Sequence, residues 1–164
     1  MKTNVTGSVQ SNEGGTGNQA TAQINVVSAQ SPPSISKSFG AASIAVGATT
    51  SLTFTISNPN ASASLTGIFF QDPLPSGLVI ANTSVGGSLC GGALMGFNPG
   101  VTVITFNGET IPGGGSCIFS VNVTGTSTGM KTNVTGPVKS NEAGPGNQAT
   151  AQITVNFPVP QASR

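Results

Sequence analysis

The sequence predicts an all-β protein, an immunoglobulin-like β-sandwich of about seven to nine strands built as a tandem-repeat module. Three observations lead to this fold class. Short segments alternate apolar and polar residues with the period of two that a half-buried strand requires. Glycine (23 residues) and proline (11 residues) separate these segments as turns, and no helical period is present. A segment at the start of the chain also recurs near its end.

The recurring segment is the feature around which the chain is organised. Residues 1–26 match residues 130–155 at 21 of 26 positions. A self-match at a fixed offset is the signature of a repeat architecture. Because Met1 aligns with the internal Met130, we expect the first residue to be a cut inside a longer protein.

This repeat predicts how the chain is divided. We expect a hairpin at residues 1–27, a linker at 28–33, a complete repeat at 34–156 and a second linker at 157–164. A lone hairpin is marginally stable in water, so the first segment needs a partner. We expect it to belong to a preceding repeat or to donate strands to a neighbouring copy, with a contact face that consists of Asn18, Ala20, Ala22, Ile24 and Val26.

The strands of the complete repeat follow from alternation and turn residues. Residues 51–58 are the clearest case, because Leu52, Phe54 and Ile56 share one face. A glycine-rich segment at 86–100 is expected to be a long loop. The expected strands are 34–39, a short edge segment at 42–47, 51–58, 66–72, 77–81, 101–106, 117–124, 131–138 and 147–155.

Composition excludes several classes of function. The chain has nine charged residues and a net charge of +1, so it lacks the basic patch of a nucleic-acid-binding protein. Histidine is absent, and two cysteines cannot form a structural zinc site, so we expect no metal or other cofactor. No apolar run approaches a membrane span, and we expect no membrane insertion in this segment. Multi-turnover catalysis is therefore not expected.

Three polar residues fall on faces that are otherwise apolar. Lys37 lies between Ile35 and Phe39 in the alternation, and Asp72, the sole aspartate, follows Ile68 and Phe70. Asn147 leads the apolar face of the last expected strand, together with Ala149, Ala151, Ile153 and Val155. Charged side chains are rarely fully buried unless they are paired.

These residues predict an intramolecular isopeptide bond between Lys37 and Asn147, promoted by Asp72. Burial disfavours charge, and therefore lowers the pKa of a lysine and raises that of a carboxyl group. A neutral amine is a nucleophile, and a protonated carboxyl group can polarise an amide carbonyl. Holding the two groups together supplies the proximity that the reaction needs, and ammonia leaves.

Two alternatives stay open at this point. Lys37 and Asp72 can form a buried ion pair with Asn147 hydrogen-bonded beside it, and such a pair is weak evidence for net stability. Asn133 is the second choice as cross-link acceptor. Its neighbours Val134 and Val138 predict that it faces outward, unless a bulge reverses the alternation.

Several segments resemble the conserved repeat domains of large bacterial cell-surface and fibre proteins. They are SISKSFG, LTFTISNPN, FFQDPLPSGL, GGGSCIFSVNV and GNQATAQITV, and together they extend over about residues 33–155. That family carries a lysine in the first strand, an Asp-x-Leu-Pro turn and an asparagine near the end, matched here by Lys37, Asp72 and Asn147. The resemblance implies an immunoglobulin-like fold, an association with stalks, adhesins and fibres, and internal isopeptides in some relatives.

Cys90 and Cys117 are the only cysteines. In an extracellular β-domain we expect them to form a disulfide, with two buried thiols as the alternative.

Two functions follow from these features, both outside the cell or on its surface. The first is a structural repeat of a fibre or stalk, whose partners are neighbouring copies of the same repeat. The second is an adhesin module that binds a ligand through the loop at 86–100, and an exposed apolar patch around Leu94, Met95 and Phe97 would favour it.

Overall fold

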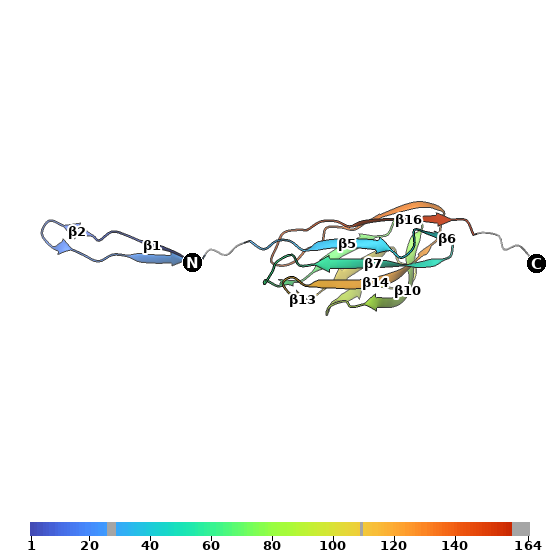
Figure 1. Cartoon of the computed structure of the whole chain (residues 1–164), viewed down its shortest axis with the longest axis horizontal. Helices are drawn as coiled ribbons and strands as arrows, with labels where there is room; N and C mark the ends of the chain where they lie inside the picture. The colour runs from blue at the N-terminus through green and yellow to red at the C-terminus, as the bar shows by residue number, and fades with distance from the viewer. Residues whose placement is uncertain (26–28, 109, 159–164) are drawn as a thin grey trace, which may run out of the picture.

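The computed structural model describes residues 1–25, 29–108 and 110–158. All regular elements in these residues are strands, which confirms the all-β class (Figure 1). A helix long and apolar enough to span a membrane is not found in this described part of the chain. The strands form a sandwich and a separate N-terminal hairpin.

One layer of the sandwich is a four-stranded antiparallel sheet in the order β10-β14-β7-β5. β7 and β14 lie in its centre and alternate buried with less buried residues along most of their length. This pattern is the period of two seen in the sequence. The bounds are β5 Ser34–Phe39, β7 Thr49–Ser57, β10 Leu78–Gly87 and β14 Ser116–Gly125.

The opposite layer is assembled from shorter pieces. β12 pairs with β11 and β9, and a bridge between Phe69 and Lys139 joins β9 to the segment after β15. β15 and β16 form an antiparallel pair, and β6 adds to β16 in parallel. A small pair, β8 with β13, closes one end. The bounds are β6 Ser43–Ala45, β8 Leu65–Thr66, β9 Phe69–Pro73, β11 Ala93–Met95, β12 Val103–Asn107, β13 Thr110–Ile111, β15 Gly129–Val134 and β16 Thr150–Asn156.

Four phenylalanines form the centre of the core between the layers. Phe54 and Phe119 come from the four-stranded sheet, whereas Phe70 and Phe106 come from the opposite layer. Their side chains are buried, and the ring centroids of Phe106 and Phe119 lie 5.0 Å apart. Aromatic contacts of this kind add to the hydrophobic term, so these rings hold the layers together.

Several strand boundaries differ from the sequence-based expectation; for example, the strand expected at 131–138 ends at Val134 as β15. The short strand expected at 77–81 extends to Gly87 as β10, whose pairing with β14 shifts register between Ile80 and Val85. The loop expected at 86–100 contains strand β11. The last strand begins at Thr150 and not at Asn147. Alternation alone locates none of these boundaries, because a bulge and a pairing partner decide them.

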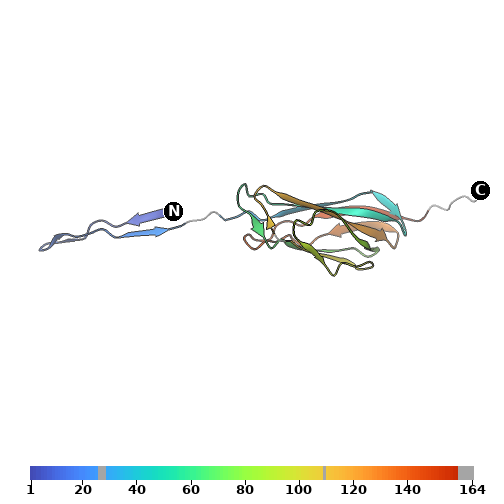
Figure 2. The ribbon, with the colours of Figure 1, turned by 90° about the horizontal axis from the view of Figure 1, so that it is seen from below.

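The N-terminal segment is a hairpin, as predicted. β1 (Lys2–Val5) pairs with β4 (Thr21–Ile24), and β2 (Gln10–Ser11) pairs with β3 (Gly15–Thr16) near the tip. All of residues 1–25 are exposed, and Figure 2 shows the hairpin apart from the sandwich. Val26, expected in its contact face, lies outside the described residues.

The chain enters and leaves the sandwich at opposite ends. β5 begins at the end nearer the hairpin, and β16 ends at the other (Figures 1 and 2). A pull on the two ends of the sandwich therefore acts along its length.

The aromatic core predicts a large effect of truncating one ring. Phe119→Ala should lower the free energy of unfolding by about 3–5 kcal/mol, because it removes a fully buried ring and leaves a cavity. Urea denaturation measures this change. Ile118→Ala is the matched control on the same strand, since Ile118 is 51% exposed and should cost well under half as much. Equal losses in the two variants would contradict this description of the core.

Candidate functional site

A buried polar cluster lies between the two layers and is the candidate site. Lys37 lies on β5, where its strand partner in β7 is the core residue Phe54. Asp72 lies on β9, opposite Ile104. Neither side chain has any exposed area, and Lys37 Nζ lies 2.7 Å from Asp72 Oδ1. The sequence-based expectation that both residues face the core therefore agrees with the structure.

Asn133 on β15 is the third member of the cluster. Its side chain is fully buried, and its Nδ2 donates a hydrogen bond of 2.8 Å to Asp72 Oδ2. The two oxygens of one carboxylate thus hold the lysine amine and the asparagine amide. Asn133 Oδ1 is buried with no hydrogen-bond partner among the described residues. An unsatisfied buried acceptor costs free energy, so this arrangement is incomplete as a hydrogen-bond network.

The environment of Lys37 favours the neutral amine. Burial lowers the pKa of Lys37 below its ordinary value of 10.5, and the hydrogen bond and the charge of Asp72 oppose this only in part. The neutral amine carries the lone pair that a nucleophile needs.

Asn147, the first choice as acceptor, lies elsewhere. Its side chain is exposed, so the expectation that it faces the core is wrong. Its Oδ1 accepts a hydrogen bond of 2.9 Å from the Ile35 N–H, and its Nδ2 donates one of 2.7 Å to the Ile35 carbonyl. The amide therefore occupies the free edge of β5 in the way that a neighbouring strand would. It makes no hydrogen bond to Lys37 or Asp72 among the described residues.

The outward orientation expected for Asn133 is also wrong. Asn133 and Thr135 are buried, whereas Val134 between them is 39% exposed. The expectation took Val134 as an inward residue, since valine is usually buried. Alternation places Asn133 on the inward face of β15 only if it is counted from Thr135, which is buried. The Thr135 hydroxyl accepts a hydrogen bond from the Ala149 N–H.

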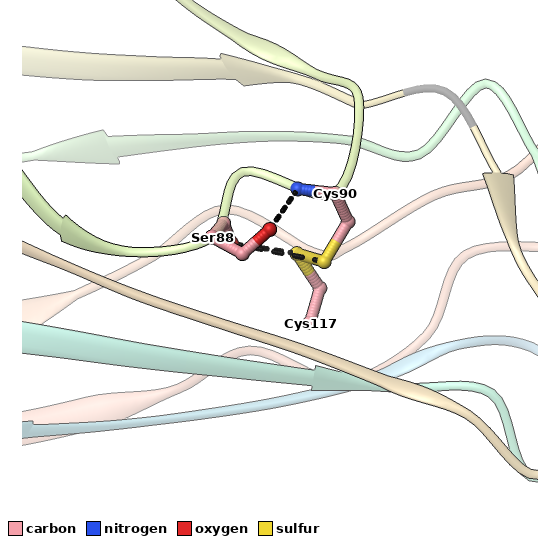
Figure 3. The surroundings of a disulfide bond; sticks show 3 residues. All are labelled: Ser88, Cys90 and Cys117. Carbon is pink, nitrogen blue, oxygen red and sulfur yellow. Dashed lines mark hydrogen bonds between the residues drawn. A yellow bond between two sulfur atoms is a disulfide. The ribbon is translucent and has the colours of Figure 1, made fainter.

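A disulfide joins the loop after β10 to β14. Cys90 and Cys117 are bonded, with Cα atoms 5.9 Å apart and a sequence separation of 27, which confirms the predicted disulfide (Figure 3). Cys117 is buried, and the Cys90 N–H donates a hydrogen bond of 3.1 Å to Ser88 Oγ. The disulfide therefore holds one side of this loop against the core.

The remaining candidates form no second site. Of the three residues expected to form an apolar patch in the loop at 86–100, Met95 is exposed, but Leu94 and Phe97 pack partly against the core. Within the described ranges, no group of three His, Cys, Asp or Glu side chains could hold a metal ion.

Comparison with protein families identifies the family to which the sandwich domain belongs. The family model described as Domain of unknown function (DUF7933) matches residues 33–155, which include all of the buried polar cluster. The chain belongs to the DUF7933 family. No curated protein matches it.

Solved structures share the fold of this DUF7933 domain at low sequence identity. One is a cohesin module of a family 33 glycoside hydrolase from Clostridium perfringens, with a TM-score of 0.55, 10% identity and coverage of 80% of this chain and 100% of the module. Another is BcpA, the major pilin subunit of Bacillus cereus, with a TM-score of 0.54 and 14% identity. That match covers 94% of this chain and 47% of the pilin, so this chain spans about half of it. At these identities the likeness concerns the fold alone.

The disulfide predicts a measurable contribution to stability in this DUF7933 domain. Replacing both Cys90 and Cys117 by alanine should lower the free energy of unfolding by about 3 kcal/mol, because the unfolded chain regains the entropy of the open loop. Urea denaturation with and without a reductant measures it. The reductant should destabilise the original protein by a similar amount and leave the double variant unchanged. A response of the double variant to the reductant would contradict this origin of the effect.

Proposed function

We propose that this chain is a structural repeat of an extracellular or cell-surface fibre or stalk, joined end to end with like repeats. We further propose that an amide bond between Lys37 and Asn133, promoted by Asp72, stabilises it. The observation that carries the proposal is the buried carboxylate of Asp72, whose two oxygens contact Lys37 Nζ and Asn133 Nδ2.

The proposed reaction needs no cofactor. The neutral Lys37 amine attacks Asn133 Cγ, a C–N bond forms and the Cγ–Nδ2 bond breaks. The leaving NH2 group takes one proton from the amine and departs as ammonia. Burial of the amine supports this step because it lowers the pKa of Lys37. Proximity in a rigid core replaces the encounter of two molecules in solution. The reaction happens once per chain, so the protein is not a turnover enzyme.

Asp72 has two roles in this proposal. It holds the amine, and it can polarise the amide. A half-turn of the Asn133 amide would exchange its oxygen and nitrogen, so that Oδ1, which now has no partner, would face Asp72 Oδ2. A proton that Lys37 passes to Asp72 across their contact would then be donated to that oxygen, and it would stabilise the negative charge that develops there during attack.

The position of the bond suits a chain under tension. Force that enters at β5 and leaves at β16 would pass through Lys37, the amide bond and Asn133. Residues 38–132 would lie inside a covalent loop that cannot be extended. The chain enters the sandwich at one end and leaves it at the other, which supports this direction of force. The disulfide adds a second covalent constraint and fits an oxidising location outside the cytosol.

Ligand binding through the loop at 86–100 is the alternative adhesin function. Because Leu94 and Phe97 pack partly against the core, Met95 is the large apolar side chain that this loop exposes, and the loop offers little apolar surface to a ligand. The fibre function therefore has the better support.

The cross-link predicts a change in mass. The intact folded protein, reduced and alkylated, should be lighter than its calculated mass by one ammonia, and a digest should contain Lys37 joined to Asn133. Lys37→Met, Asp72→Ala and Asn133→Ala should each retain the full mass. Asn147→Ala is the matched control and should still lose ammonia, because its amide contacts Ile35 and not Lys37. A full calculated mass of the original protein would leave Lys37 and Asp72 as a buried ion pair.

Lys37 also predicts a pH dependence of stability. In Asn133→Ala the lysine stays a free amine with a pKa lowered by burial, so the unfolded chain binds more protons than the folded chain at alkaline pH. The free energy of unfolding of this variant should therefore rise with pH, through the window between the lowered pKa and 10.5. The original protein, whose cross-linked nitrogen does not titrate, should lack this rise. Identical pH profiles would contradict the proposal.

A further inference from the structure

The N-terminal hairpin has the same strand register as the closing hairpin β15–β16 of the sandwich. Lys2 pairs with Ile24, and the aligned Lys131 pairs with Ile153. The three following pairs also correspond: Thr3 with Gln23 and Thr132 with Gln152, Asn4 with Ala22 and Asn133 with Ala151, Val5 with Thr21 and Val134 with Thr150. The two hairpins therefore share one structure over these four pairs, whereas the β2–β3 pair near the tip of the free hairpin has no counterpart in the closing hairpin among the described residues.

The hydrogen bonds beyond the strands correspond as well. The Thr6 N–H donates to the Ala20 carbonyl at 2.9 Å, as the Thr135 N–H does to that of Ala149 at 2.9 Å. The Ala20 N–H donates to Thr6 Oγ1 at 2.9 Å, matching 2.8 Å between Ala149 and Thr135. The free hairpin thus keeps the backbone shape that the closing hairpin has inside the sandwich.

The residues that face the sandwich are conserved between the two hairpins. None of the five positions that differ, which are 137, 139, 143, 145 and 154 in the closing hairpin, is buried. The buried positions are Asn133, Thr135, Val138, Ala149, Ile153 and Val155, and they align with the identical Asn4, Thr6, Val9, Ala20, Ile24 and Val26. The N-terminal hairpin therefore carries a complete inward face.

Among the described residues, nothing covers that inward face. Val9 is 67% exposed and Ile24 is 65% exposed, whereas the aligned Val138 and Ile153 are 0% and 1% exposed. Residues that face outward behave differently, because Met1 and Met130 are both exposed, at 75% and 69%. The loss of exposure at Val138 and Ile153 thus falls on the face that contacts the sandwich.

We propose that the N-terminal hairpin closes the sandwich of a second copy of this domain, with Asn4 beside that copy's Lys37 and Asp72 in the position of Asn133. This inference rests on the proposed function only for its covalent step. Asn4, and not Asn18 of the same hairpin, is the acceptor in this inference, because Asn18 aligns with Asn147, which contacts the Ile35 backbone. Asn18 would bind the same edge of β5 in the second copy.

Contacts at the tip of the closing hairpin indicate that the N-terminal hairpin can bind at the same position on a second sandwich. Asn141 Nδ2 donates to Thr66 Oγ1 at 3.1 Å, and the Glu142 carboxylate accepts from the Thr66 N–H at 2.8 Å. The free hairpin has the same residues at the aligned positions, Asn12 and Glu13. A second copy would therefore recognise the tip, the inward face and the edge of the hairpin.

The covalent step would join two chains. The Lys37 amine of one copy attacks Asn4 Cγ of the other, a C–N bond forms, and Nδ2 leaves as ammonia. Such a contact is heterologous, so each copy can both give a hairpin and receive one, and the assembly grows head to tail. The position that β15–β16 occupies on a sandwich holds one hairpin. The N-terminal hairpin of one copy therefore competes there with the closing hairpin of the other.

The experiment uses two full chains joined head to tail in one polypeptide. This linkage gives the hairpin of the second copy a high effective concentration at the first sandwich. In the first copy, Asn133→Ala removes the local acceptor and Asn4→Ala removes its own hairpin's acceptor. After unfolding and refolding, we expect a cross-linked peptide that joins Lys37 of the first copy to Asn4 of the second. Even infrequent exchange accumulates, because the amide bond is irreversible.

Matched variants in the second copy identify the acceptor. Asn4→Ala there should abolish this peptide, whereas Asn18→Ala should retain it. If the unsubstituted tandem joins Lys37 to Asn133 but the substituted tandem loses no ammonia from its first copy, the hairpin inference is wrong and the proposed cross-link stands. A peptide that joins Lys37 to Asn18 would overturn the assignment of Asn4.

A second measurement tests whether the N-terminal hairpin binds a second sandwich, independently of the covalent step. Ile153→Asp in the first copy should lower the Tm of its sandwich by about 10 °C, because it places a charge in the core. In the tandem, the second hairpin should replace the damaged one and restore most of this loss relative to the single chain. Ile24→Asp in the second copy should cancel the recovery, and Val5→Asp, on the outward face, should not. No recovery in the tandem would overturn the inference, even if no isopeptide forms in any variant.

Discussion

The buried contact between Lys37 and Asp72, with no exposed side-chain area, joins parts of the chain that lie far apart in sequence. Lys37 comes from the first strand of the sandwich, Asp72 from the opposite layer, and Asn133 from the closing hairpin. Burying a lysine amine and a carboxyl group costs free energy unless each is paired, and the 2.7 Å contact between them offsets that cost. The two layers must therefore meet in one register at this point, and the closing hairpin must present a polar residue there. A purely apolar core would tolerate more variation in how the two layers and the closing hairpin are positioned.

The same cluster explains why the domain depends on its last two strands. β5 is an edge strand, and an open edge is a hazard for aggregation. Asn147 covers that edge by binding the backbone of Ile35, and Asn133 completes the buried cluster. A hairpin that supplies both contacts is a separable unit, since its internal hydrogen bonds form whether or not a sandwich lies beneath it. The N-terminal hairpin has the internal bonds, but its apolar face is exposed.

Much of this structure could be predicted from the sequence. Alternation with period two indicated the inward faces of β5, β7 and β14, because both sides of these strands differ strongly in polarity. The same argument marked Lys37 and Asp72 as buried, since each lies in register with apolar neighbours. The disulfide followed from having two cysteines and an extracellular composition. The repeat of residues 1–26 at 130–155 predicted two hairpins of one kind.

The sequence by itself determined the all-β class, the repeat, the disulfide and two members of the buried cluster. Only the tertiary structure decided which asparagine joins them. Asn133 and Asn147 both stand in segments with valine and alanine neighbours, and alternation fails where a strand has not yet begun, as at Asn147, or where a valine faces solvent, as at Val134. The side chain that reaches Asp72 is selected by the packing of β15 against β9, which is a contact between segments about sixty residues apart and leaves no periodic trace in either one.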